Sequence, residues 1–188
     1  NVVYESTAGA FVNVTNLENG KITIDGQNIA SKKVALNSTY TVNVTPDNGY
    51  AVENIFVNNN PVEDVTYSNQ TATVTLNSGD ENDATFNITA QTVQCKLDVK
   101  AAEVSYHNGM STDKIAQNIF AAVVGKDNVP EITLNDVTIE YDASLTGLNN
   151  WKAIGYQPEW YEPTLHKFGK STEKIRITYN GTDKYPSM

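Results

Sequence analysis

The sequence predicts a mostly β protein of two small antiparallel β-sandwich or β-grasp-like domains, the second with one α-helix. Three observations lead to this class: apolar and polar residues alternate in many short segments, turn residues separate those segments, and only one segment has helical periodicity. Segment 39–45 is the clearest strand. Tyr40, Val42 and Val44 fall on one face of it and polar residues on the other, which is typical of a half-buried antiparallel strand.

Residues 1–93 are expected to form the first, all-β domain. Turn residues such as Asn19-Gly20, Asp25-Gly26 and the 46–49 segment Pro-Asp-Asn-Gly recur between the alternating segments. Asn-Gly and Asp-Gly pairs favour tight hairpin turns, because both residues tolerate positive φ. The expected strands lie at 12–14, 22–24, 34–36, 39–45, 51–57, 72–76 and 86–90. Short strands at this spacing indicate a small sandwich or barrel-like domain.

Residues 94–188 are expected to form a β-rich, immunoglobulin-like domain with a helix at about 112–124. Ser111 or Thr112 can cap the start of this helix, and Gly125 stands where a left-handed residue commonly ends one. The expected strands lie at 97–106, 137–141 and 175–179, and a long irregular stretch at 143–171 holds both tryptophans.

The charge and cysteine content limit the possible partners and environment of the chain. The net charge of −9 and the lack of a basic cluster argue against binding to nucleic acid or to anionic lipid. No apolar run approaches the roughly 20 residues of a membrane span. Cys95 is the one cysteine, so an internal disulfide is excluded. Because the chain opens at Asn1 without Met, we expect it to be part of a longer precursor.

Two parts of the chain resemble modules of bacterial surface proteins. The first part resembles divergent internalin-type B-repeats, in which a strand, a Pro-x-x-Gly-Tyr turn and a strand ending in Val-Asn-Gly recur. The matching segments are GKITIDG at 20–26, TYTVNVTP at 39–46, GYAV at 49–52 and IFVN at 55–58. Asn59 replaces the final Gly of the pattern, which leaves the geometry of that turn open. The tail at 175–186 resembles the last strand of bacterial immunoglobulin-like modules. Both resemblances imply a secreted or cell-wall-associated protein, and neither supplies catalytic residues.

We expect no catalytic residues, no metal site and no cofactor. His107 and His166 lie in loops without a nucleophile motif, and Cys95 is expected to be a small buried hydrophobe. The acidic turn of Asp80, Glu81 and Asp83 lacks a complete calcium-loop pattern. Paired carboxylates for glycoside hydrolysis could be drawn from Glu140, Asp142, Glu159 and Glu162, but nothing in the sequence identifies a general acid.

The best candidate for ligand binding is the aromatic stretch. Exposed aromatic faces can stack on sugar rings or hold a peptide, and the candidate residues are Trp151, Tyr156, Trp160 and Tyr161. The competing interpretation places Trp151 and Tyr156 on a core strand, because large aromatic side chains are mostly buried. An internal Lys–Asn isopeptide cross-link is a further possibility that the sequence leaves open.

These observations favour a non-catalytic module of a secreted or cell-surface bacterial protein, acting as a stalk, display or adhesion domain. It would be a monomer within a longer chain, located outside the cell, at the cell surface or in the cell wall. Its partner would be a host or cell-wall glycan or a protein. The alternative is an accessory glycan-binding region of a secreted carbohydrate-active enzyme, and a third possibility is that the chain is itself a hydrolase.

Overall fold

The computed structural model describes residues 7–105, 110–142, 149–154 and 174–188. The chain divides into two compact units, each described by itself below. The first unit comprises the residues up to Cys95 together with Gly181–Pro186, and the second comprises Lys96–Asn180 with Ser187–Met188. This division differs from the expected second domain of residues 94–188, because the chain returns to the first unit near its end.

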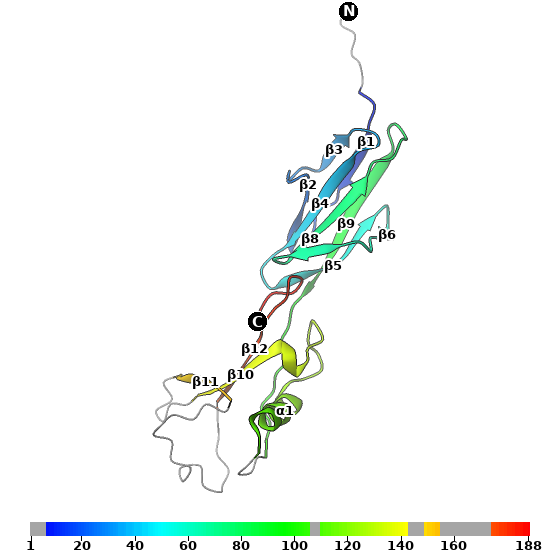
Figure 1. Cartoon of the computed structure of the whole chain (residues 1–188). Helices are drawn as coiled ribbons and strands as arrows, with labels where there is room; N and C mark the ends of the chain where they lie inside the picture. Colours follow the sequence, from blue (N-terminus) through cyan, green and yellow to red (C-terminus); the bar gives the residue numbers. More distant parts are fainter. Residues whose placement is uncertain (1–6, 106–109, 143–148, 155–173) are drawn as a thin grey trace, which may run out of the picture. The chain divides into compact units, whose positions relative to one another are not determined.

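The first unit is a two-sheet sandwich (Figure 1). One sheet has the strand order β3-β1-β9-β5-β6, and the other has the order β2-β4-β8-β7. In chain order, the strands are β1 (Ala10–Val14), β2 (Gly20–Ile24), β3 (Ser31–Val34), β4 (Thr39–Pro46), β5 (Tyr50–Val57), β6 (Asn60–Pro61), β7 (Thr66–Ser68), β8 (Thr71–Asn77) and β9 (Thr85–Gln94).

The core of the first unit lies between its two sheets and is built from alternating strand positions. On β4, the side chains of Tyr40, Val42 and Val44 are buried, while the residues between them face outward, as the alternation in the sequence predicts. Facing them across the sandwich are Val12 of β1 and Ile88 of β9, both fully buried. Burial of apolar surface on this scale is the main stabilising contribution to such a small domain.

Two features of the sheets do not follow from local alternation. Strand β1 pairs with β9 in parallel, from Phe11 opposite Thr85 to Val14 opposite Ile88, whereas every other strand pair of the first unit is antiparallel. Strand β5 has a register shift between Val52 and Asn54, which is the signature of a β-bulge. Val52 and Ile55 are consequently both buried in the core although they lie three positions apart.

Three hairpin turns of the first unit have two consecutive residues with positive φ, the geometry that matches the twist of hairpin strands. Asp25 and Gly26 form the predicted turn, with φ of 47° and 75°. Asn59 adopts the left-handed conformation although it replaces the Gly of the repeat pattern. Asn69 and Gln70 join β7 to β8, and neither β7 nor this turn was expected from the sequence.

The second unit contains helix α1 (Thr112–Val123), a short 3₁₀ helix η1 (Leu134–Asp136) and a three-stranded antiparallel sheet. The sheet has the order β11-β10-β12, from β10 (Val137–Asp142), β11 (Trp151–Ala153) and β12 (Ile175–Tyr179). Ser111 caps α1, because its side chain accepts a hydrogen bond from the amide of Lys114 at 3.3 Å. The predicted mostly β class with one helix at about 112–124 is therefore confirmed.

Two expectations for the second unit are wrong. The strand expected at 97–106 is reduced, over its described residues, to an isolated bridge at Val99, next to another at Lys96. Val99 is 48% exposed, so the apolar alternation there does not face a core. Gly125 does not adopt a left-handed φ, because α1 ends through the extended residue Val124. The close approach of Asp98 explains the glycine instead, since a Cβ atom at this position would overlap the Asp98 carboxylate.

Candidate ligand-binding surface

The second unit carries a polar surface on one face of its three-stranded sheet. In the sheet register, Glu140 at the centre of β10 lies between Ala153 of β11 and Arg176 of β12, and Asp142 lies opposite Trp151. Because side chains alternate across a strand, Glu140, Arg176 and Trp151 share one face. The opposite face carries Ile139 and Tyr179, which are both buried.

Arg176 links the three strands of this surface. Its Nε donates to Glu140 Oε2 at 2.7 Å, and its Nη2 lies 2.6 Å from the same oxygen. Its guanidinium carbon lies 4.7 Å from the centroid of the Trp151 ring, which is a cation–π geometry. The Arg176 side chain is 46% exposed, so this arrangement is open to solvent and suited to contact with a ligand.

The predicted aromatic residues fall in different parts of the chain. Trp151 lies in β11, half-buried, on the polar face beside Arg176. Tyr156, Trp160 and Tyr161 lie outside the described residues, as do His107 and His166. The structure therefore places one of the four candidates. It adds Arg176 and Glu140, whose pairing depends on the register of two strands far apart in sequence.

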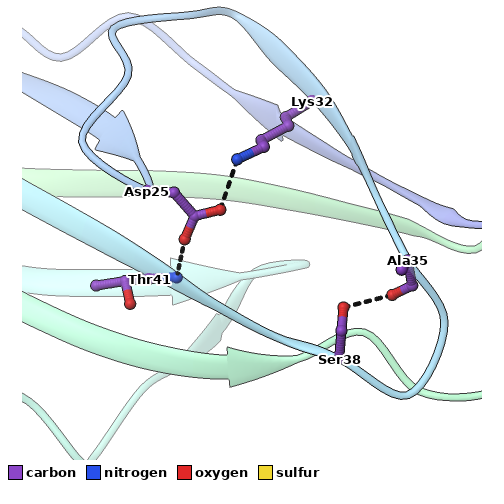
Figure 2. A network of polar contacts seen from close by, with 5 residues as sticks. All are labelled: Asp25, Lys32, Ala35, Ser38 and Thr41. Atoms are coloured by element: carbon purple, nitrogen blue, oxygen red, sulfur yellow. Dashed lines mark hydrogen bonds and ion pairs between the residues drawn. The ribbon is translucent and has the colours of Figure 1, made fainter.

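In the first unit, Asp25 is the centre of a polar network at the end of β2. Figure 2 shows its two carboxylate oxygens directed at different partners. Lys32 Nζ donates to Oδ2 at 2.6 Å, and the amide of Thr41 donates to Oδ1 at 2.8 Å. The hydrogen bond from Lys32, followed by that from Thr41, lowers the pKa of Asp25. This carboxylate ties the β2 hairpin to β3 and β4.

Ser78 has a similar role directly after β8, before the acidic turn of Asp80, Glu81 and Asp83. Its side chain is 1% exposed, and its hydroxyl donates to the carbonyl of Ala35 at 2.7 Å. The hydroxyl oxygen of Ser78 also accepts a hydrogen bond from the amide of Ser38, at 3.0 Å. Beside it, the Ser38 hydroxyl also donates to the Ala35 carbonyl, at 2.6 Å (Figure 2). Ser78 therefore holds the loop between β3 and β4.

The acidic turn before β9 also holds backbone in place. The amide of Asp83 donates to the carbonyl of Gly9 at 2.8 Å, and the amide of Gly9 donates to Asn82 Oδ1 at 2.9 Å. An Asp83 carboxylate oxygen lies 3.7 Å from Lys33 Nζ.

Cys95, the residue directly after β9, is half-buried, and burial raises the pKa of its thiol.

Two of the surface hollows in the described structure are lined mostly by uncharged residues. One, of about 390 Å³, is lined by part of α1 and by residues 103–105, with Glu103 as its only acidic residue. The other, of about 100 Å³, is formed by the 45–50 turn, Asn69, Gln70 and Pro186, with Asp47 as its only acidic residue. Neither hollow brings several ionisable side chains together.

The fold and these surfaces define a β-sandwich unit followed in sequence by a unit of one sheet and one helix. Comparison with protein-family models, curated proteins and solved structures finds no match for the chain. Within the described ranges, no helix is long and apolar enough to span a membrane. No group of three or more His, Cys, Asp or Glu side chains in those ranges is arranged to hold a metal ion.

Proposed function

We propose that the chain is a non-catalytic module of a secreted or cell-surface protein, acting in spacing, display or adhesion. One observation supports this most directly: well-placed polar side chains bind the backbone of neighbouring turns. Asp25 binds the amide of Thr41, Ser78 binds the Ala35 carbonyl, and Asp136 binds the amide of Thr133 at 2.7 Å. Side chains used in this way stabilise turns, as a rigid module outside the cell requires.

The resemblance of 20–58 to B-repeat modules supports the same proposal. Its turns, at Asp25-Gly26 and at Asn58-Asn59, have the left-handed geometry of tight hairpins. Short turns of this kind leave little mobile chain for proteases to cleave, which suits a protein exposed to the surroundings of the cell. Bacterial origin and cell-wall attachment belong to this proposal as well.

Antibody labelling of cells that encode the chain tests the location. Antibodies raised against the 188-residue chain are applied to intact and to permeabilised cells, with an antibody against a cytoplasmic protein as the control. We expect labelling of intact cells, or recovery of the protein from the culture medium. Labelling that appears only after permeabilisation, with no secreted protein, would contradict the proposal.

A second candidate function, glycan binding by an accessory region of a secreted enzyme, is favoured by the position of Trp151. This side chain lies half-buried on a polar sheet face and beside the exposed Arg176. A glycan array identifies binders, and the variant Trp151→Ala tests the site. The matched control is Phe11→Ala, since Phe11 is an exposed aromatic residue of the first unit, at 36%. Binding lost only in Trp151→Ala supports this function, and an array without binders removes it.

A further inference from the structure

The first and last strands of the sandwich lie side by side and run in the same direction. Strand β1 pairs in parallel with β9 over four residue pairs, from Phe11 opposite Thr85 to Val14 opposite Ile88. The chain therefore enters β1 at one end of the sandwich and leaves β9 at the other end (Figure 1). Tension along the chain pulls these two strands in opposite directions along their own axes.

Hydrogen bonds run across this pair at several points, and they resist such sliding. The amide of Phe11 donates to the carbonyl of Ala84 at 2.8 Å, and the amide of Thr15 donates to that of Ile88 at 3.0 Å. These two bonds mark the ends of the ladder, and in a parallel pair the bonds between them are evenly spaced. All of them are loaded together by sliding, whereas a hairpin pulled open at its end breaks one bond at a time.

Side chains reinforce the same pair on both faces. On the outer face, Asn13 Nδ2 donates to Asn87 Oδ1 at 3.2 Å, and Ser31 Oγ of β3 donates to Asn13 Oδ1 at 2.8 Å. On the inner face, Val12 and Ile88 are both fully buried in the core. Sliding β1 past β9 would have to break this polar row and displace both core side chains.

Strand β9 is held on its other edge as well, so it cannot be peeled away alone. It pairs antiparallel with β5, from Tyr50 opposite Gln94 to Val57 opposite Ile88. We propose that the β1–β9 pair is a mechanical clamp, which makes the first unit resist tension transmitted along the chain. This property goes beyond the proposed function and does not depend on where the protein is located.

Single-molecule force spectroscopy on the full chain tests the clamp. One handle is attached at the N-terminus and the other at a cysteine introduced by Gln94→Cys in a Cys95→Ser background, so that the load passes through the first unit. Thr15→Pro removes the amide that bonds β1 to Ile88, and its matched control Val62→Pro removes the amide that donates to the Ile55 carbonyl at 2.9 Å, outside the clamp.

We expect Thr15→Pro to lower the unfolding force by roughly a fifth, because one of the evenly spaced bonds of the pair is lost. Val62→Pro should lower the force less, although it removes a side chain that packs on the core. An equal or larger reduction in Val62→Pro would overturn the proposal, even if antibody labelling had placed the protein at the cell surface.

A milder pair of variants keeps the test decisive if a proline variant does not fold. Asn13→Ala removes the side-chain bond between β1 and β9, while Asn54→Ala removes the bond from Asn54 Nδ2 to Gln91 Oε1, at 3.4 Å, between β5 and β9. Circular dichroism first establishes that both variants are folded. We expect the lower unfolding force in Asn13→Ala, and equal forces in the two variants would count against the clamp.

Discussion

Tyr40 brings a hydroxyl group into the core of the sandwich. The residue is 1% exposed, and among the described residues its hydroxyl oxygen is the buried side-chain polar atom without a hydrogen-bond partner. Its ring lies 6.2 Å from that of Phe86, tilted by 54°, so the aromatic body is well packed. Burial raises the pKa of Tyr40 to about 12. The hydroxyl thus lowers the stability that the ring provides.

We therefore expect Tyr40→Phe to stabilise the first unit. Removing a buried hydroxyl that has no partner should raise the free energy of unfolding by about 1 kcal/mol. Urea denaturation at neutral pH measures the difference, and Tyr50→Phe is the control, because Tyr50 is only half-buried. A loss of stability in Tyr40→Phe would show that the hydroxyl is bonded in solution.

The same residue predicts how stability changes in alkali. The folded state holds the Tyr40 proton more tightly than the unfolded state, whose tyrosine pKa is about 10. The contribution of Tyr40 to stability is therefore complete below pH 10 and is lost as the pH rises toward 12, by about 2 kcal/mol. Unfolding measured between pH 9 and about 11.5 should show a shallower decline in Tyr40→Phe than in the native chain. Parallel declines would contradict the prediction.

Ser78 provides the opposite case, a buried polar group whose bonds are made. In Ser78→Ala, the carbonyl of Ala35 and the amide of Ser38 each lose a bond, which should cost about 1–3 kcal/mol. Thermal unfolding measures this loss, with Ser68→Ala as the exposed control. Equal stabilities in the two variants would show that water replaces Ser78.

At the scale of elements, the strands of the first unit were predictable where each strand has one buried face. The alternation on β4 and the turn at Asp25-Gly26 are encoded within a few residues, so they are visible in the sequence. Strand β7 does not stand out in the sequence because Thr66–Ser68 is only three residues long, with the half-buried Tyr67 between two exposed residues. The parallel partner of β1 was missed because it lies more than 70 residues away in sequence.

Gly125 follows the end of helix α1 for a structural reason that differs from the predicted one. Gly125 looked like a left-handed helix terminator, but its lack of a side chain makes room for Asp98. Asp98 accepts a hydrogen bond from the amide of Gly125 through its carbonyl, at 2.9 Å, and one from the amide of Asp127 through its carboxylate, at 3.3 Å. Contacts of this kind depend on the tertiary structure.

We expect Gly125→Ala to destabilise the second unit by about 1–3 kcal/mol, because the added methyl group displaces the Asp98 carboxylate. A double-mutant cycle with Asp98→Ala checks the cause, since the alanine at 125 should cost much less once the carboxylate is absent. The helical signal in circular dichroism reports both variants during thermal unfolding. Additive effects would show that Asp98 is not responsible.

The candidate surface was predictable only in part, for a related reason. The sequence indicates Trp151 as a candidate binding residue, because it is a large aromatic residue in a polar stretch. In the sequence, Glu140 is only one of several carboxylates, and no feature distinguishes Arg176 as a site residue. Their contact at 2.7 Å depends on the register of β10 with β12, which are separated by more than 30 residues. No local pattern encodes that register.

At the scale of the whole molecule, the chain contributes Gly181–Pro186, close to its C-terminus, to the first unit. The amide of Gln70 donates to the carbonyl of Asp183 at 2.7 Å, and Gln70 Nε2 donates to that of Thr182 at 3.1 Å. Lys184 Nζ lies 5.1 Å from the centroid of the Tyr67 ring. These contacts support a turn in which Gln70, without being glycine, has a φ of 64°.

Hydrogen exchange followed by NMR tests this arrangement. In the full chain we expect the Gln70 amide to be protected, and in a chain truncated after Asn180 we expect it to exchange as an open turn does. The amide of Gln27 is the control, because its bond to the Ile24 carbonyl, at 2.9 Å, lies in another hairpin. Unchanged protection of Gln70 after truncation would show that the tail is not its partner.

The parallel pairing of β1 with β9 has a consequence for the order of events during synthesis. Strand β1 leaves the ribosome early and can pair with β3, but its other edge stays open until Thr85–Ile88 has been made. Contacts between residues so distant in sequence slow folding, because a long loop must close before they form. The first unit should therefore complete its sheet only after release of its last strand, and a nascent chain halted before that point would expose an edge prone to aggregation.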